Sequence, residues 1–383
     1  MSTLKTTNLQ APAAASPAIV LASDGTATAQ LSSLNGGALS GARNRIINGD
    51  MRIDQRNAGA ATANTISGYT LDRWYVLQTT TGKLIAQQNA GSVTPPSGFT
   101  NYLGITSQSA YSIISSDVFE IFQAIEGYNF ADLGFGSASA KAVTISFWVR
   151  SSLTGTFGGA LKNSGGSRSY PFSYTISSAN TWEQKTITIS GDTSGTWLTT
   201  NGIGAYVLFG LGVGSTESGT AGSWSGSNYS SATGATSVVG TNGATFYITG
   251  VQLEAGTVAT PFERRSFGHE LQLCERYYEK SYNLNAVPGT NVGSNTGEWV
   301  SVTINSADYY DFGRCSFRTR KRASPTMTLW STDGTLNAAR QQDAGNVTAV
   351  IRTTFNETSG SFGCAGATGS QYHRIHFAAS AEL

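Results

Sequence analysis

One stretch decides the fold, residues Ala244–Lys280: ATFYITGVQLEAGTVATPFERRSFGHELQLCERYYEK. Its first third alternates apolar and polar residues with the period of a β-strand. The alternation shifts by one position at Gly250, which predicts a β-bulge that keeps the apolar face turned inward. Pro261 ends the strand region, and the residues that follow have the apolar spacing of a helix. The stretch therefore predicts a strand, a turn and a helix at the boundary between two β domains.

The helix is predicted over Ser266–Lys280, with Ser266 as its N-cap. Leu271, Leu273 and Tyr277 fall on two neighbouring apolar stripes. A single helix between two β domains has more apolar surface here than a simple connector needs, so we expect these side chains to lie at an oligomer interface. Three copies around a threefold axis would bury them in a homotrimer, and packing under the neighbouring sandwich would also bury them.

Outward from this stretch, the chain divides into four parts. Residues 1–45 are rich in Ala, Ser, Thr and Gly, cannot form a core alone, and are expected to dock onto other proteins as an extended leader. Residues 46–265 form a large β domain, and 266–282 form the connecting helix. Residues 283–383 alternate again in about five places, which predicts a small C-terminal β-sandwich.

Two features locate the core of the large domain. Val143–Val149 has the cleanest period-two alternation in the chain. Trp74 lies among apolar neighbours, so we expect its indole to anchor the core rather than to stack on a sugar.

Composition favours a mainly β protein. Charged residues make up 12% of the 383 residues, and there are 45 glycines, which suits turn-rich strands with hydroxyl-bearing solvent faces. The net charge of +1 gives no electrostatic reason to expect a nucleic acid or a membrane as partner. The three cysteines and three histidines have none of the spacings of a metal site, so we expect no metal and no cofactor. Sparse cysteines of odd number are typical of assembly in a reducing cytoplasm.

Four motifs resemble, in the same order, a recurring set in bacteriophage and prophage virion proteins, mostly tail fibres or tail-associated proteins. They are ARNRIINGDMRIDQR (42–56), GYTLDRWYV (68–76), VTISFWVRSSLTGTF (143–157) and GVQLEAGTVATPFERRSFGHELQLCERYYEKS (250–281). The region that they bracket is similar to carbohydrate-binding modules of the family 4/9 type, which are jelly-roll β-sandwiches. The N-terminal opening resembles the leader of structural proteins from cyanobacterial and marine phages.

This resemblance implies a virion protein with an extended N-terminal leader, a large jelly-roll β-sandwich, one short connecting helix and a small C-terminal β-sandwich. It implies a homotrimeric tail fibre, assembled in the host cytoplasm, that recognises host cell-surface polysaccharide. Residues 1–45 would attach it to other virion proteins of the tail, baseplate or head. One alternative is a structural appendage that binds no glycan, such as a head decoration or head fibre, a neck protein or a tail adaptor. The other is a polysaccharide depolymerase.

Aromatic residues in Gly- and Ser-rich loops are the candidate glycan-binding residues, because shallow sugar sites depend on ring faces more than on charge. Trp224 and Tyr229 are the aromatics of the longest such loop, Gly214–Gly243, and Trp197 lies in a similar loop. The alternative is that these rings pin their loops onto the sandwich. Trp148 is a further candidate on the hydroxyl-rich face of a strand, unless the leader or a neighbouring subunit covers it.

The sequence gives no support for catalysis. It contains no nucleotide-binding loop and no hydrolase elbow, so no catalytic residue is assigned and we expect the protein not to be an enzyme. Glycoside cleavage needs two carboxyl groups a few ångströms apart. Glu120 with Glu126, or Glu254 with Glu263, could converge in space, although their spacing singles out neither pair.

Overall fold

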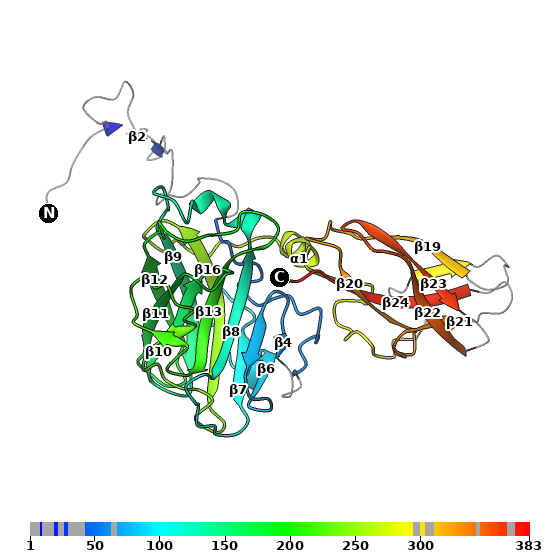
Figure 1. The fold of residues 1–383 in the computed structure, drawn as a ribbon, viewed down its shortest axis with the longest axis horizontal. Coiled ribbons are helices and arrows are strands. Elements are labelled where there is room, and N and C mark those ends of the chain that lie inside the picture. Colours follow the sequence, from blue (N-terminus) through cyan, green and yellow to red (C-terminus); the bar gives the residue numbers. More distant parts are fainter. Residues whose placement is uncertain are drawn as a thin grey trace.

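The computed structural model describes residues 8–9, 19–21, 27–29, 43–62, 67–293, 299–302, 310–341, 345–365 and 372–383. Two β domains lie side by side, with helix α1 (Phe267–Glu275) and the C-terminus between them (Figure 1). The fold is mainly β, as predicted. Most of the predicted leader lies outside the described residues, and its described part holds the short strands β1 (Asn8–Leu9), β2 (Ile19–Leu21) and β3 (Ala27–Ala29).

Two antiparallel sheets pack face to face in the large domain and form the predicted jelly roll. The front sheet contains, in spatial order, β11 (Ser169–Ile176), β10 (Gly155–Lys162), β13 (Ile203–Val213), β8 (Val118–Glu126), β5 (Tyr75–Gln78) and β4 (Gly68–Tyr69). The back sheet contains β12 (Glu183–Ile189), β9 (Val143–Ser151), β16 (Thr245–Ala255), β7 (Leu103–Ser107) and β6 (Leu84–Gln88). The connections include η1 (Ala90–Ser92), η2 (Gly127–Asn129), η3 (Ala131–Leu133), β14 (Ser218–Gly219) and β15 (Ser231–Ala232).

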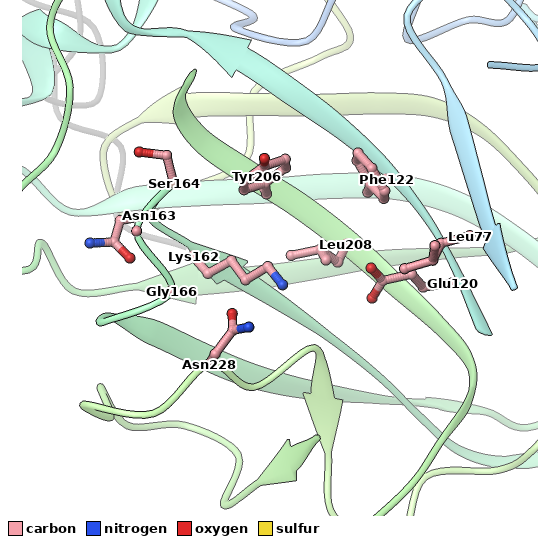
Figure 2. A pocket seen from close by; sticks show the side chains of 11 residues that line it. Leu77, Glu120, Phe122, Lys162, Asn163, Ser164, Gly166, Tyr206, Leu208 and Asn228 are labelled. Atoms are coloured by element: carbon pink, nitrogen blue, oxygen red, sulfur yellow. The ribbon is translucent and has the colours of Figure 1, made fainter. Parts of the chain in front are cut away.

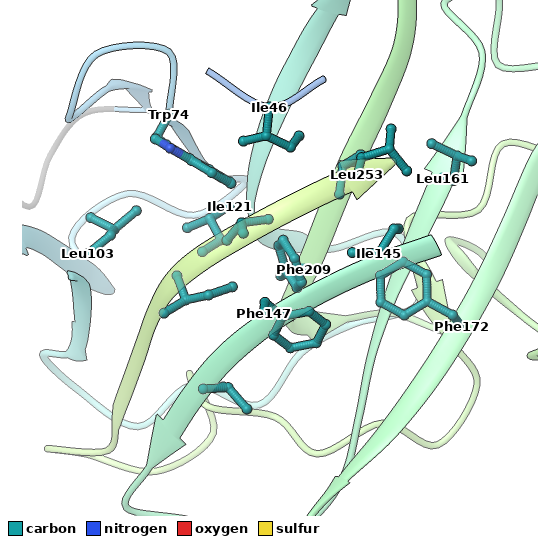
Figure 3. Packing of buried hydrophobic residues seen from close by; sticks show 14 of the residues in the cluster. Ile46, Trp74, Leu103, Ile121, Ile145, Phe147, Leu161, Phe172, Phe209 and Leu253 are labelled. Atoms are coloured by element: carbon teal, nitrogen blue, oxygen red, sulfur yellow. The ribbon is translucent and has the colours of Figure 1, made fainter. Parts of the chain in front are cut away.

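The core of the large domain lies between these sheets (Figure 3). Phe147 of β9 meets Phe209 of β13 in an edge-to-face contact, with ring centroids 4.9 Å apart. Trp74 is fully buried and donates from its indole N–H to the Asn48 carbonyl. The predicted core positions, Trp74 and the alternating run in β9, are therefore confirmed.

The predicted bulge in β16 is confirmed as well. The register of β16 against β9 shifts between Thr249 and Gln252, and Gly250 has a φ of +62°. Glycine adopts this conformation without the strain that a Cβ would bring. A Cβ at this position would also lie 2.6 Å from the Phe99 ring. The bulge lets apolar residues on both sides of it face the core.

Helix α1 begins where predicted but ends earlier. Ser266 is its N-cap, and the Ser266 hydroxyl accepts from the His269 N–H. The prediction of a helix as far as Lys280 is wrong, because β17 (Tyr278–Lys280) pairs with β24 (Tyr372–Ser380). So short a segment satisfies helical and strand periodicity equally, and the distant strand β24 decides between them.

The C-terminal domain is built around β24. In the part that the structure describes, β17, β18, β20 and β21 all pair with β24, and the ladder continues from β21 through β22 and β23 to β19. These strands are β18 (Trp299–Val302), β19 (Tyr310–Ser316), β20 (Thr326–Trp330), β21 (Ala338–Gln341), β22 (Gly345–Thr353) and β23 (Ser359–Ala365). Sequence alternation misses β21 and β23, because one is short and the other is rich in Gly and Ser.

A buried ionic cluster joins the two domains. Arg73 is 1% exposed and pairs with Glu382 of the C-terminal tail, and Arg56 pairs with the same carboxylate at 2.7 Å. The Arg73 guanidinium also lies over the Tyr277 ring, 3.6 Å from its centroid. A buried guanidinium is tolerated only where a carboxylate and hydrogen bonds compensate its lost hydration. The tail therefore ties Arg56 and Arg73 of the large domain, and through Arg73 the Tyr277 ring just after α1, to the C-terminal domain.

Residues from three of the four sequence motifs (42–56, 68–76 and 250–281) meet at the same junction. Glu126, at the end of β8, accepts hydrogen bonds from the Arg276 guanidinium at 2.6 and 2.8 Å and from the Tyr277 hydroxyl at 2.6 Å. Gln55 donates to the Asp72 carboxylate from its backbone and from its side chain. The polar residues of these motifs therefore serve here to build the domain junction.

The helix residues expected at an oligomer interface contact their own chain. Tyr277 is fully buried, and Leu271 and Leu273 are partly buried in a cluster with Ile47 and Ile53. Tyr277 has no exposed surface to offer another copy, which contradicts its expected place in an oligomer interface. Packing under the neighbouring sandwich accounts for the apolar stripes, and the homotrimer stays a prediction.

Candidate functional site

A row of aromatic side chains crosses the outer face of the front sheet. Its members come from the neighbouring strands β4, β5, β8 and β13 and are Tyr69, Tyr75, Phe122 and Tyr206. Consecutive ring centroids are 5.0, 4.9 and 5.5 Å apart. Successive side chains of a strand alternate between faces, so these rings point away from the core that their sequence neighbours fill. All four rings are partly exposed and give the sheet an apolar outer surface.

A hollow of about 310 Å³ lies at the Tyr206 end of this row. Strands β8, β10 and β13 supply its floor, and the turn at 163–166 and Asn228 line its edge. In Figure 2, Tyr206 and Phe122 lie on one side of the hollow and Asn228 on the other. A concave surface that combines ring faces with a few amide and charged groups has the composition of a sugar-binding site.

The turn after β10 is a preformed wall of the hollow. Asn163 and Arg168 exchange hydrogen bonds, from Arg168 N–H to Asn163 Oδ1 at 3.1 Å and from Asn163 N–H to the Arg168 carbonyl at 3.0 Å. Gly166 has a φ of +64°, and an added Cβ would lie 3.0 Å from the Asn228 side chain. The Arg168 guanidinium donates twice to Asp192, at 2.7 Å each. Such a fixed wall loses little conformational entropy when a ligand binds.

The floor of the hollow contains an incompletely paired carboxylate. Glu120 is 2% exposed, and its Oε2 has no hydrogen-bond partner among the described residues. Burial raises the pKa of the Glu120 carboxyl to about 7, although the Lys162 ammonium and the Ser230 hydroxyl oppose this shift. Lys162 donates to Ser230 at 3.3 Å and lies 5.8 Å from the centroid of the Tyr206 ring. One face of Tyr206 is therefore turned toward the charged floor.

Trp197, a residue predicted to bind glycan, is part of the core. It is 7% exposed, stacks on Phe130 with ring centroids 5.6 Å apart, and meets Phe135 edge to face. Its indole N–H donates to the Asp192 carboxylate at 3.3 Å. A ring enclosed in this way has no free face for a sugar, which contradicts the expected role of Trp197.

Trp224 holds its loop against the sandwich, whereas the Tyr229 ring packs within the loop itself. The indole N–H of Trp224 donates to the Ser190 carbonyl at 2.8 Å, and its ring meets Tyr170 edge to face. Tyr229 packs against Gly219, where an added Cβ would lie 2.2 Å from the Tyr229 ring. The contacts of Trp224 match the alternative in which the aromatics pin the loop. Both rings remain partly exposed, so a direct contact with glycan stays a prediction.

Trp148 lies on the back sheet, away from the hollow. It is partly exposed beside the bulge, where a Cβ added at Gly250 would lie 3.2 Å from its ring. The structure therefore does not bring Trp148 together with Trp224 and Tyr229, and its binding role stays a prediction.

The acidic pairs considered for catalysis do not meet in the hollow. Glu120 and Glu126 share the outer face of β8, but six residues of extended strand separate them by about 20 Å, against about 5–10 Å in glycosidases. Glu254 accepts from Thr260, and Glu263 accepts from the Asn44 N–H. Of the residues lining the hollow, Glu120 is the only carboxylate.

In the described part of the chain, no group of three or more His, Cys, Asp or Glu side chains is placed to hold a metal ion. No described helix has the length and apolar character needed to cross a membrane.

The hollow was not predicted from the sequence. Phe122 and Glu120 lie in VFEIFQAIE (118–126), where apolar side chains on both faces hide the strand period. The available signal was Glu120 itself, a single charge in the middle of an apolar run.

Comparison with known proteins gives distant structural similarities only. No family model and no curated protein matches the sequence. Among solved structures, the enzymatically active domain of bacteriophage CBA120 tailspike protein 4 is 13% identical, with a TM-score of 0.32 over 57% of this chain and 22% of that one. A protein described as CBM4 is 14% identical, with a TM-score of 0.28 over 54% of this chain and 97% of that one.

A further similar structure is a family 11 carbohydrate-binding module from Clostridium thermocellum in complex with a mixed-linked tetrasaccharide. It is 12% identical, with a TM-score of 0.26 over 49% of this chain and 91% of that one. TM-scores this low do not establish a common fold, so these similarities carry no weight for function.

Proposed function

We propose that the chain is a glycan-binding protein of a bacteriophage particle, a tail fibre whose front sheet recognises host cell-surface polysaccharide. The observation that carries the binding function is the hollow beside Tyr206, where an aromatic row meets a fixed polar wall and a buried carboxylate. Sugars present apolar ring faces and many hydroxyls, and both kinds of surface have counterparts here. The virion location and the tail-fibre role are supported by the four sequence motifs.

The binding function is tested on a glycan array with Tyr206→Ala and Tyr206→Phe. We expect the wild-type chain to bind, Tyr206→Ala to lose about tenfold in affinity, and Tyr206→Phe to keep most of it, because the ring face carries the contact. Trp182→Ala, which removes a partly buried indole just before β12 of the back sheet, is the control and should bind like wild type. Wild-type affinity in Tyr206→Ala would instead favour a structural appendage that binds no glycan at this face.

A depolymerase remains the second candidate because of Glu120. A buried carboxyl with a pKa near neutrality can act as a general acid, and Glu217 is close enough to raise the Glu120 pKa further. The same array samples, assayed for new reducing ends, separate the two functions. We expect no new reducing ends, because glycoside cleavage needs a second carboxyl group and the nearby Glu217 does not line the hollow. Reducing ends that disappear in Glu120→Gln would establish the enzyme instead.

Trimer formation and attachment through residues 1–45 belong to the same proposal and can be tested together. The described leader strands pair only with one another, so removing residues 1–40 takes no strand from either β domain. We expect the full chain to have the mass of a trimer in light scattering and the truncated chain to fold but not to enter phage particles. A stable monomer at micromolar concentration would refute the trimer, and normal incorporation of the truncated chain would refute attachment by the leader.

A further inference from the structure

One oxygen of the carboxylate in the floor of the hollow has no partner among the described residues, and a charged side chain lies nearby. In Figure 2 the Lys162 ammonium and the Glu120 carboxylate face one another across the floor. In the part of the chain that the structure describes, no ion pair joins them. The Ser230 hydroxyl accepts from Lys162 and also bonds to the Glu120 carboxyl, which leaves Glu120 Oε2 as the oxygen without a partner. A buried acceptor without a donor is costly, and a ligand that supplies the donor recovers that cost.

The chemistry of the two groups restricts what can lie between them. A carboxylate only accepts hydrogen bonds, and an ammonium only donates them. A group that satisfies both must donate on one side and accept on the other, which a hydroxyl does. While Glu120 is ionised, a ligand carboxylate could pair with Lys162 but would have no donor for Glu120 Oε2. It would also be repelled by Glu120 and by the nearby Glu217.

We propose that the hollow selects neutral sugars over uronates. Glu120 Oε2 accepts a hydrogen bond from one hydroxyl of a sugar residue, and Lys162 Nζ donates to the neighbouring hydroxyl of the same sugar. The inference rests on the glycan-binding function proposed above. Tyr206 supplies the ring face beside these groups, and Asn228 provides amide contacts from the opposite side. Glu120 and Lys162 are thus the specificity-determining residues of the site.

This arrangement makes the affinity depend on pH. The titratable groups that face Glu120 are Lys162 of β10, Tyr206 of β13 and Glu217 of the loop that follows β13. Burial holds the Glu120 pKa at about 7, and a sugar hydroxyl that donates to the carboxylate favours its ionised form. The complex therefore binds fewer protons than the free protein, so affinity rises with pH through about 7 and levels off above it.

The test uses paired hexasaccharides that differ at C6: glucan and glucuronan, galactan and galacturonan, mannan and mannuronan. Each is titrated into the full chain by calorimetry between pH 6 and pH 8. We expect binding to a neutral member, weaker binding to its uronan, and an affinity that increases about three- to tenfold from pH 6 to pH 8. Glu120→Gln should lose about five- to tenfold in affinity at pH 8 and show a flat pH profile, because a neutral hydrogen bond replaces a charged one.

A matched pair of charges on the back sheet provides the control. Glu183 and Lys185 of β12 pair at 2.6 Å, and Glu183→Gln and Lys185→Met should leave affinity and pH profile unchanged. Urea unfolding of Glu120→Gln checks that the variant is folded. Tighter binding of a uronan than of its neutral partner would overturn the inference. So would an unchanged affinity and pH profile in Glu120→Gln while Tyr206→Ala loses binding, an outcome that leaves the glycan-binding function standing. If no member of the panel binds the wild-type chain, both the function and the inference fail.

Discussion

Replacing Glu382 by glutamine is expected to lower the free energy of unfolding by about 3–5 kcal/mol, the usual loss when one partner of a buried ion pair is removed. The Glu382 side chain is 6% exposed and serves two guanidinium groups, those of Arg73 and Arg56. Neither arginine can lose its proton, so both positive charges would remain in the junction without their carboxylate. The loss should appear in urea unfolding as a lower midpoint.

The control for this prediction is an exposed pair of the same kind. Glu357 pairs with Arg320 at 2.6 Å, but these side chains are 37% and 71% exposed. Glu357→Gln should therefore change the unfolding free energy by about 0–1 kcal/mol, because water screens the pair. Equal effects of Glu382→Gln and Glu357→Gln would show that the junction is not the buried ionic cluster described here.

Trp197→Ala is expected to lower the free energy of unfolding by about 3–5 kcal/mol, as for other large aromatic residues removed from a core. Trp197 fills the space between Phe130, Phe135 and Trp224, and no nearby side chain can replace its volume. Trp182→Ala is again the control, and its loss should be smaller because that ring is only half-buried.

A smaller change at Trp197 distinguishes between the two locations considered for a glycan site, the hollow of the front sheet and the Gly- and Ser-rich loops. Trp197→Phe keeps most of the buried ring, and Asp192 keeps its bonds to Arg168, so this variant should fold and bind glycan within twofold of wild type. A tenfold loss of glycan affinity in Trp197→Phe, with unchanged stability, would indicate that glycan binds at the loops predicted from the sequence.

Local sequence patterns predicted the parts of the fold that local forces determine. The bulge at Gly250 follows from a parity shift, and the N-cap at Ser266 follows from side-chain chemistry. The helix end could not be predicted, because Tyr278–Lys280 become a strand only through pairing with β24, about a hundred residues away.

The site escaped prediction for a related reason. Its floor brings together Glu120, Lys162 and Tyr206, which are far apart in sequence and become neighbours only when β8, β10 and β13 pair. Sequence reasoning favoured Trp197 because it stands in a Gly- and Ser-rich segment without local apolar neighbours. The rings that bury it, Phe130 and Phe135, come from a remote connection after β8.

The most direct test of glycan binding on the front sheet is photo-cross-linking with a hexasaccharide from the panel that carries a photoreactive group. Cross-linked residues would be located by mass spectrometry of the full chain. We expect them in the floor and wall of the hollow, at Lys162, Tyr206, Asn228 and the turn at 163–166. Cross-links confined to the Trp224 loop, to the back sheet or to the C-terminal domain would contradict the proposed site.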